Sequence, residues 1–418
     1  MNRGVKRRIK IATGAAILAS LLAVRFGLVR LLRAPDPASH VVRAVSRTFR
    51  DVGPRWSHDG TRIAFLRLYD SGHVSLYAAP SDLSRVCMLT RPEVLNPDQP
   101  PSTGRSSFFA PDAPAWSPDD ALLSFSRGAR FTTATGDTLP GSAVWLFDLW
   151  AGRVQPLVIQ PERCRRNGLT YRSASWSADG RLVAVVAQGP MDHASIIVTV
   201  RGSSRREVML DQADASRDID WPAWAPSGRR LAYAEGVMRG PHSARVAVLR
   251  VAEPGGSLAR RLLTITPDAY ARMCPEDVAR HHRKAIQPYI SGITWSRDGS
   301  EVMFSVTPDA NDRSRYSIWR VRAGQAGQPR RLSPADGWGY MAPSCLAGDR
   351  VGAVRYRDGQ CEAALLSLPH DDRPSPARRL FPLETDDLDF RADGNAIVIS
   401  GGLSGDGGQT TLRVISVP

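Results

Sequence analysis

Lysine is nearly absent from this chain, although arginine is abundant. It occurs only at positions 6, 10 and 284, whereas Lys and Arg together number 55 against 41 acids. Eight of the basic residues lie within the first 33 positions, which reduces the formal net charge of +14 to +6 for the remainder. The remaining arginines are scattered at expected strand ends and turns rather than clustered with aromatics, so the charge does not indicate a nucleic-acid-binding surface.

Recognisable catalytic motifs are also missing. The sequence holds no G-x-S-x-G elbow, no H-E-x-x-H pair, no Walker loop and no dinucleotide fingerprint. Its five cysteines show no C-x-x-C spacing, which excludes the common thiolate zinc sites; they are Cys87, Cys164, Cys274, Cys345 and Cys361. The sequence therefore names no catalytic residue and no cofactor.

Long apolar runs are confined to the N-terminus. Five basic residues precede the uncharged run Ile11–Val24, which is the order of an export signal. If Arg25 extends towards the interface, about 20 residues are available to span a bilayer. We expect residues 1–33 to be a signal or transmembrane anchor with its N-terminus inside, and residues 34–40 to be a linker. A basic amphipathic surface helix is the alternative, and cleavage of the segment is left open.

A short template recurs along the remainder of the chain. Its first copy, Pro54–Phe65, reads as a strand that ends in Trp56, a tight Asp59-Gly60 turn and a second strand. Gly accepts the positive φ of such a turn, and Asp can hydrogen-bond the local backbone. Further copies centre on Trp116, Trp176, Trp224 and Trp295, with weaker ones at Phe390 and Cys345. Self-similarity at a period of roughly 45 to 70 residues predicts a repeat architecture.

Two more strand-like segments follow most templates, the second of them short and basic. Six such fourth segments are found, at 85–89, 153–158, 206–210, 260–263, 330–332 and 378–380. Four antiparallel strands per unit predict an all-β fold: a single seven-bladed β-propeller over residues 41–418, or six blades if the Cys345 unit is not one. The last unit lacks its fourth strand, so we expect residues 41–46 to pair with it and close the ring.

The Trp-Ser-x-Asp-Gly core of these repeats resembles the TolB-like propeller repeats of the bacterial periplasm. That resemblance covers nearly all of residues 41–418. It implies a propeller in the cell envelope, of the kind found in the TolB component of the Tol system, in other envelope proteins, and in prolyl-oligopeptidase-type enzymes. It implies no particular activity, because one fold carries many functions.

Two sets of residues are singled out by their place in the template. The core aromatics are expected to pack between neighbouring blades; they are Trp56, Trp116, Trp176, Trp224, Trp295 and Phe390. Residues four or five positions earlier should lie at the channel mouth; they are Asp51, Asp112, Tyr171, Arg172, Asp220, Tyr340 and Asp386. The acids among them could bind a divalent cation or a basic peptide. Alternatively, they cap strand ends and contact water.

Loop lengths indicate which face is functional. The long connections lie on the face opposite the Asp-Gly turns, at 91–113, 128–142, 159–173, 264–291 and 308–315. Binding residues concentrate in loops held by a rigid scaffold. The longest connection includes Pro275–Lys284, which we expect to form a short helix, either over the channel or exposed on the surface.

We therefore expect a membrane-tethered, exported propeller that acts as a protein-interaction or ligand-binding scaffold in the bacterial envelope. Its propeller would lie in the periplasm or outside the cell, and its partners would bind the long-loop face. The alternative is a hydrolase or lyase with its site in the propeller channel, which could depend on a divalent cation. Partner, substrate and oligomeric state are not predicted.

Overall fold

The computed structural model describes the greater part of the chain after residue 39. The described residues are 40–43, 49–69, 73–91, 93–94, 113–132, 138–157, 170–188, 194–200, 207–212, 217–238, 245–253, 259–280, 286–324, 326–368, 374, 376–383, 387–401 and 410–417. The anchor expected at 1–33 lies outside them. Within these ranges, no helix combines the length and apolarity needed to cross a bilayer.

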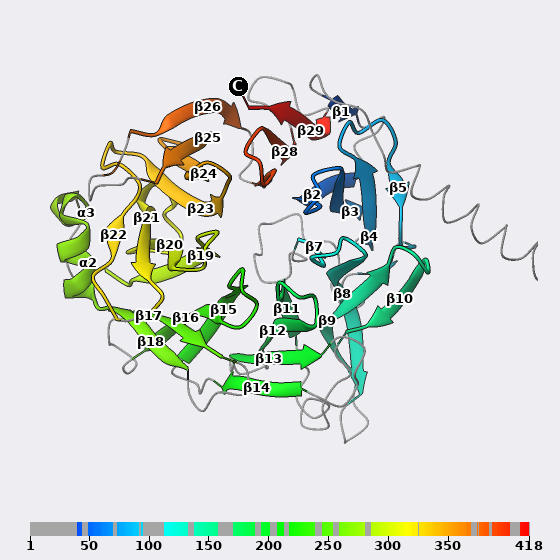
Figure 1. Ribbon diagram of the computed structural model, residues 1–418, viewed down its shortest axis with the longest axis horizontal. Coiled ribbons are helices and arrows are strands. Elements are labelled where there is room, and N and C mark those ends of the chain that lie inside the picture. Colours follow the sequence, from blue (N-terminus) through cyan, green and yellow to red (C-terminus); the bar gives the residue numbers. More distant parts are fainter. Residues whose placement is uncertain are drawn as a thin grey trace, which may run out of the picture.

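The described chain consists mainly of β-strands, and its sheets are arranged radially around a centre (Figure 1). In chain order the strands are β1 (His40–Arg43), β2 (Phe49–Trp56), β3 (Arg62–Tyr69), β4 (His73–Pro80), β5 (Cys87–Met88), β6 (Glu93–Val94), β7 (Ala115–Trp116), β8 (Leu122–Thr132), β9 (Thr138–Asp148), β10 (Arg153–Pro156), β11 (Thr170–Trp176), β12 (Leu182–Gln188), β13 (Ala194–Val200), β14 (Glu207–Gln212), β15 (Arg217–Trp224), β16 (Leu231–Met238), β17 (Arg245–Ala252), β18 (Arg260–Ile265), β19 (Tyr289–Trp295), β20 (Glu301–Thr307), β21 (Ser317–Arg322), β22 (Arg330–Arg331), β23 (Gly339–Cys345), β24 (Arg350–Arg357), β25 (Gln360–Ser367), β26 (Arg378–Leu383), β27 (Leu388–Phe390), β28 (Ala396–Ser400) and β29 (Thr410–Ser416).

Each sheet follows the chain outward from the centre. Three sheets consist of four consecutive antiparallel strands, β15–β18, β19–β22 and β23–β26, and a fourth has β2–β5 with β6 added beside β4. Strands β7–β14 form one eight-stranded sheet, in which two antiparallel sets are joined by a parallel bridge between Thr170 and Ser142. The short basic segments expected as fourth strands pair as β5, β10, β14, β18, β22 and β26.

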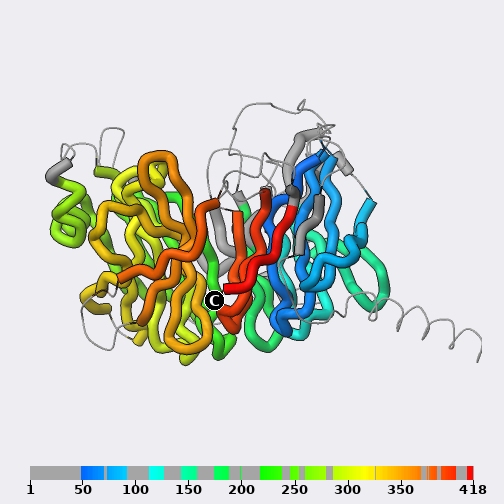
Figure 2. Tube along the Cα trace, turned by 90° about the horizontal axis from the view of Figure 1, so that it is seen from above, coloured from blue at the N-terminus to red at the C-terminus, as the bar shows by residue number. Residues whose placement is uncertain are grey.

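The first strand of each set lies innermost, and neighbouring inner strands contact one another. Such contacts join β2 to β7, β11 to β15, β15 to β19 and β19 to β23. Seen at right angles, the strands run through the thickness of the ring (Figure 2). Side chains near the start of these inner strands therefore border the centre of the molecule.

The ring is closed by the pairing of its two ends. Strand β1 lies antiparallel to β29, with His40 opposite Val414 and Arg43 opposite Thr410, in the sheet order β1-β29-β28-β27. The expected closure by the segment that starts at position 41 is thus confirmed, and positions 44–48 lie outside the described residues. Because both ends join one sheet, its edge strand finds a partner within the chain.

The template turn is built around a serine and an aspartate. The Ser57 hydroxyl donates to the Asp59 carboxylate at 2.6 Å and accepts the backbone N–H of Arg62 at 2.9 Å. Gly60 takes a φ of +68°, as expected. The turn is longer than the two-residue hairpin that Asp-Gly indicates, because Ser57 N–H pairs with the Arg62 carbonyl across four residues. The copies at Ser117, Ser177 and Ser296 repeat the serine–aspartate bond at 2.6 Å.

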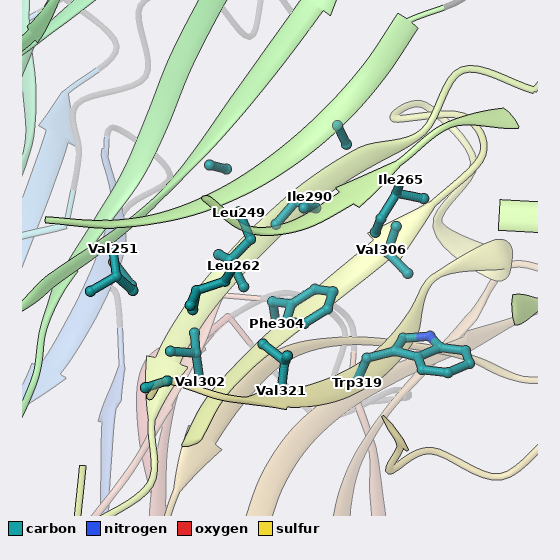
Figure 3. Packing of buried hydrophobic residues seen from close by; sticks show 14 of the residues in the cluster. Leu249, Val251, Leu262, Ile265, Ile290, Val302, Phe304, Val306, Trp319 and Val321 are labelled. Atoms are coloured by element: carbon teal, nitrogen blue, oxygen red, sulfur yellow. The ribbon is translucent and has the colours of Figure 1, made fainter. Parts of the chain in front are cut away.

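The template aromatics are buried at the junctions between neighbouring sheets, and none is more than 9% exposed. Trp295 packs in a cluster with β17 and β18 of the preceding sheet, where Leu249 and Leu262 face Val302 and Phe304 (Figure 3). Phe390 lies directly against Gly352 of β24, since a Cβ at that glycine would be 2.6 Å from the ring. Where the template has an aromatic residue, the sheet is therefore held to its neighbour by one large side chain and its apolar surroundings.

Two connections differ from their expected structure. Segment 128–142, expected to be a loop, is mostly a hairpin, because β8 and β9 stay in register out to Thr132 and Thr138. Segment 264–291 contains two helices, α2 (Pro267–Met273) and the expected α3 (Pro275–Arg280). Figure 1 places both at the outer rim beside β18 and β22 rather than over the centre, so these two helices do not cover the channel. Tyr270 and Cys274, which precede α3, are fully buried, whereas Pro275 is exposed and Glu276 to Val278 are half-buried, so α3 lies at the surface.

Candidate functional site

A left-handed residue interrupts four of the inner strands at the same point. It lies three positions before the template aromatic, or before Cys345, and the four residues are Gly53, Trp221, Gly292 and Ala342, with φ between +53° and +60°. The pairing register shifts at each of these points, so each is a β-bulge. Glycine or alanine occupies three of the positions. Trp221 occupies the fourth.

Trp221 is one of the few large apolar side chains exposed in the described structure, at 39% of its surface. Its indole Nε1–H donates to the Tyr289 hydroxyl at 3.2 Å, and its backbone N–H donates to the Asp220 carboxylate at 2.8 Å. The bond to Tyr289 thus orients the ring and the bond to Asp220 holds the backbone, while much of the side chain contacts solvent. A bulky residue at φ > 0 costs on the order of 1–3 kcal/mol, and such strain concentrates at functional sites.

The surroundings of Trp221 come from two neighbouring sheets. Tyr289 begins β19, and the Arg245 guanidinium of β17 lies 4.9 Å from its ring centroid. Arg245 reaches Asp218 of β15 at 3.2 Å by crossing β16 at Gly236, where an added Cβ would be 2.1 Å from Nη2. We call Asp218, Asp220, Trp221, Arg245 and Tyr289 the Trp221 site. It places an indole, a phenol, a guanidinium and two carboxylates at one junction of the inner strands.

Two carboxylates lie close to the centre of the Trp221 site. The pKa of Tyr289 is raised, chiefly by burial, then by the Asp220 carboxylate and more weakly by that of Asp218. The indole N–H of Trp221 and the Arg245 guanidinium act in the opposite direction on that pKa. The phenol therefore stays protonated at neutral pH and can serve as a hydrogen-bond partner rather than as a base.

Two other residues expected at the channel mouth already bind other side chains of the protein. Asp51 is buried and forms a two-point ion pair with Arg67, at 2.7 and 2.9 Å. The Tyr340 hydroxyl donates to Asp336 at 2.8 Å, and the pKa of Tyr340 is raised, mainly by burial. Both residues lie on inner strands as expected, and both already have strong internal partners.

The remaining expected site residues have no described side chains. Asp112 and Asp386 lie outside the described residues. Tyr171 and Arg172 belong to β11 and pair with Ala187 and Val186 through the backbone. Of the seven expected residues, only Asp220 therefore takes part in the Trp221 site.

Within the described ranges, no three His, Cys, Asp or Glu side chains cluster in a way that could hold a metal ion. The four described cysteines, Cys87, Cys274, Cys345 and Cys361, are free thiols. Burial raises the pKa of Cys274 to about 11, so this thiol stays protonated and packs as an apolar group. Cys164 lies outside the described residues.

Most of the Trp221 site was not predicted from the sequence. Trp221 stands three positions before the template residue Trp224, and no role was predicted for it. A signal was nevertheless present: the equivalent positions hold Gly53, Gly292 and Ala342, so a tryptophan there breaks the pattern. Arg245 and Tyr289 carried no such signal, because only the packing of two sheets brings them to β15.

Comparison with known proteins supports the fold. No family model matches the chain, and no curated protein matches it. An oligogalacturonate lyase in complex with manganese superposes with a TM-score of 0.57 at 12% identity, over 88% of this chain and 90% of that one. A puromycin-hydrolysing peptidase of Mycobacterium tuberculosis gives 0.55 at 15%, over 92% of this chain and 56% of that one. A protein of Agrobacterium tumefaciens described as a TolB gives 0.43 at 16%, over 80% and 94%. The radial arrangement of the sheets and the first two of these superpositions show a β-propeller fold.

Proposed function

We propose that this chain is a ligand-binding or protein-binding β-propeller of the bacterial envelope, tethered to the inner membrane through residues 1–33. Its eight-stranded sheet counts as two blades, because only one parallel bridge joins the halves, and the propeller then has seven blades. The Trp221 site is its binding centre, at the inner strands on the side away from the Asp-Gly turns.

The exposed Trp221 is the observation that carries this proposal. Binding sites combine aromatic surface with a few oriented polar groups, and the Trp221 site offers both at a junction between two sheets. Its indole is held in place by Tyr289, and its backbone by Asp220, before any ligand arrives. Such preorganisation reduces the ordering that binding must otherwise impose.

Other charged groups of the inner and middle strands serve the scaffold instead. Glu235 is buried between Arg217 and Arg250. Glu362 is buried and accepts from Arg355 at 2.8 Å and from Arg379 at 2.8 Å. These pairs link neighbouring strands within one sheet, which leaves the Trp221 site as the place where polar groups converge beside an exposed aromatic ring.

A second candidate function is a channel-type enzyme, either a hydrolase or a lyase. It is favoured by the likeness to an oligogalacturonate lyase in complex with manganese, which spans most of both chains. The Trp221 site would then hold a saccharide substrate, and carboxylates of the channel would bind a divalent cation. The shared fold is compatible with this activity and does not establish it.

An affinity capture tests the proposed function. The full-length protein is purified from detergent-solubilised membranes of its source organism and compared with Trp221→Gly. Ala342→Gly is the matched control, because Ala342 has the same left-handed backbone on β23. A stoichiometric partner retained by the control and lost in Trp221→Gly is the expected result. Full retention by Trp221→Gly would contradict it.

The enzyme alternative is tested with the same purified protein. Oligogalacturonate is incubated with it in the presence and absence of Mn²⁺, and the unsaturated product of a lyase is followed by ultraviolet absorbance. Turnover that disappears in Trp221→Gly would favour the enzyme over the scaffold.

A further inference from the structure

We propose that the Trp221 site receives a cationic side chain, the guanidinium or ammonium group of a protein partner, stacked on the Trp221 indole beside Asp218. This inference rests on the proposed binding function and names the chemistry of the partner. It follows from three features: an indole that the fold does not require, the chain's own use of tryptophan rings, and the charges around the site.

The fold does not need a tryptophan at position 221. The bulge requires a left-handed residue, and Gly53 and Gly292 meet that requirement without strain. At Gly53 the adjacent inner strand is so close that a Cβ would be 2.7 Å from the Ala113 Cα. At the equivalent position of β15 a large side chain is nevertheless present, and 39% of Trp221 contacts solvent. An exposed, strained and oriented indole indicates a ligand-contacting residue.

Several other tryptophans of the chain lie beside an arginine guanidinium. Arg62 lies 4.9 Å from the Trp116 ring centroid, Arg230 lies 5.1 Å from that of Trp295, and Arg391 lies 5.6 Å from that of Trp56. Trp221 has no such cation among the described residues. Tryptophan is the strongest of the aromatic side chains in cation–π contacts. Its exposed ring is therefore available for a cation–π contact of the kind that this protein makes at other blade junctions.

The charges around Trp221 favour the same occupant. Asp218 carries a negative charge beside the positive charge of Arg245, 3.2 Å away. The Asp218 side chain is 43% exposed, so its carboxylate can meet an incoming cation as well as Arg245. An exposed carboxylate beside a π-face attracts a basic group and disfavours an acidic one.

The test uses a matched pair of peptides. The full-length protein is labelled with 5-fluorotryptophan, and the Trp221 resonance is assigned as the one missing from Trp221→Gly. Acetyl-Gly-Arg-Gly-amide is titrated against its citrulline counterpart, which has nearly the same shape and no charge. We expect a saturable shift of the Trp221 resonance with the arginine peptide, and binding about tenfold weaker with citrulline. Asp218→Asn should weaken binding of the arginine peptide more than binding of the citrulline peptide.

Three results would overturn the inference. The first is equal binding of the two peptides. The second is a stronger response of the Trp221 resonance to methyl β-glucoside than to the arginine peptide, which would assign the site to a sugar. The third is a large fall in melting temperature in Trp221→Gly but not in Ala342→Gly, together with no peptide binding, which would make Trp221 structural.

The inference and the proposed function can fail separately. A partner captured through Trp221, with no preference for arginine over citrulline, would retain the binding function and refute the cationic occupant. An arginine preference without any captured partner or turnover would establish the cation site and refute the scaffold.

Discussion

The indole N–H of Trp56 donates to the backbone oxygen of Asp389, 3.2 Å away, although 333 positions separate the two residues. The same bond recurs at other junctions, each time to the residue before the preceding template aromatic. It joins Trp116 to Arg55 at 3.0 Å, Trp224 to Ser175 at 3.0 Å and Trp295 to Ala223 at 2.8 Å. The Trp56 bond therefore continues the pattern across the join between the last and first sheets.

Asp389 strengthens this join, and we expect Asp389→Ala to destabilise the protein by about 1–3 kcal/mol. Its carboxylate accepts the backbone N–H of Trp56 at 2.8 Å, and the substitution leaves that donor without a partner. Urea denaturation provides the measurement. Asp82→Ala is the control, because Asp82 accepts a backbone N–H in an exposed turn. Equal losses in both variants would contradict the prediction.

Gly53→Ala and Gly152→Ala should separate backbone strain from crowding. Both glycines have a φ of +60°, so both substitutions carry the left-handed cost of about 1 kcal/mol. At Gly152 nothing lies within 4 Å of the added Cβ, whereas at Gly53 the Cβ would be 2.7 Å from the Ala113 backbone. We expect Gly53→Ala to lose at least 1 kcal/mol more in thermal or urea unfolding. Equal effects would mean that the backbone around Ala113 can shift to accommodate the added Cβ.

The Asp51–Arg67 pair should behave as a structural unit. The Asp51 side chain has no exposed surface, so Arg67→Met leaves a buried carboxylate without its counter-ion, at a cost of about 3–5 kcal/mol. The double variant Asp51→Asn with Arg67→Met should be more stable than Arg67→Met alone. A double-mutant cycle by denaturation measures the coupling. A ligand-binding role for Asp51 would instead show as lost binding with little change in stability.

Stability should depend on pH through His58. Its Nδ1 lies 2.9 Å from the Asp120 carboxylate, and this hydrogen bond raises the pKa of His58 above 6.5. The pKa is higher in the folded state, so the added stability is complete below about pH 6.5 and is lost as pH rises through the folded-state pKa.

Comparing the wild type with His58→Gln between pH 5 and 9 tests this dependence. We expect the wild type's advantage to shrink as pH rises. NMR titration of the imidazole should give a midpoint above 6.5. A stability difference that does not change with pH would refute the role of this pair.

Sequence reasoning identified what depends on local chemistry. The Asp59-Gly60 turn, the short basic fourth strands and the segment that closes the ring were all found from residue patterns, because each is specified within a few positions of chain. The hairpin at 128–142 was missed because its strands pair beyond the apolar residues that marked them.

Contacts between distant segments could not be predicted from the sequence. Asp51 and Arg67 face each other only once the register of β2 and β3 is fixed. Arg245 reaches Asp218 only because Gly236 leaves space for its guanidinium. The Trp221 site combines three strands of two sheets, so no single stretch of sequence contains it.

The β1–β29 pairing has a mechanical consequence. Chain ahead of His40 enters the ring through the strand that holds the ring shut, and β1 is fixed to β29 by the pairs from His40–Val414 to Arg43–Thr410. A pulling force applied through residues before His40 would reach these few backbone pairs before it reached any blade core. The resistance of the closed ring to such a load is therefore set by one short strand, and its release would turn a closed ring into an open arc.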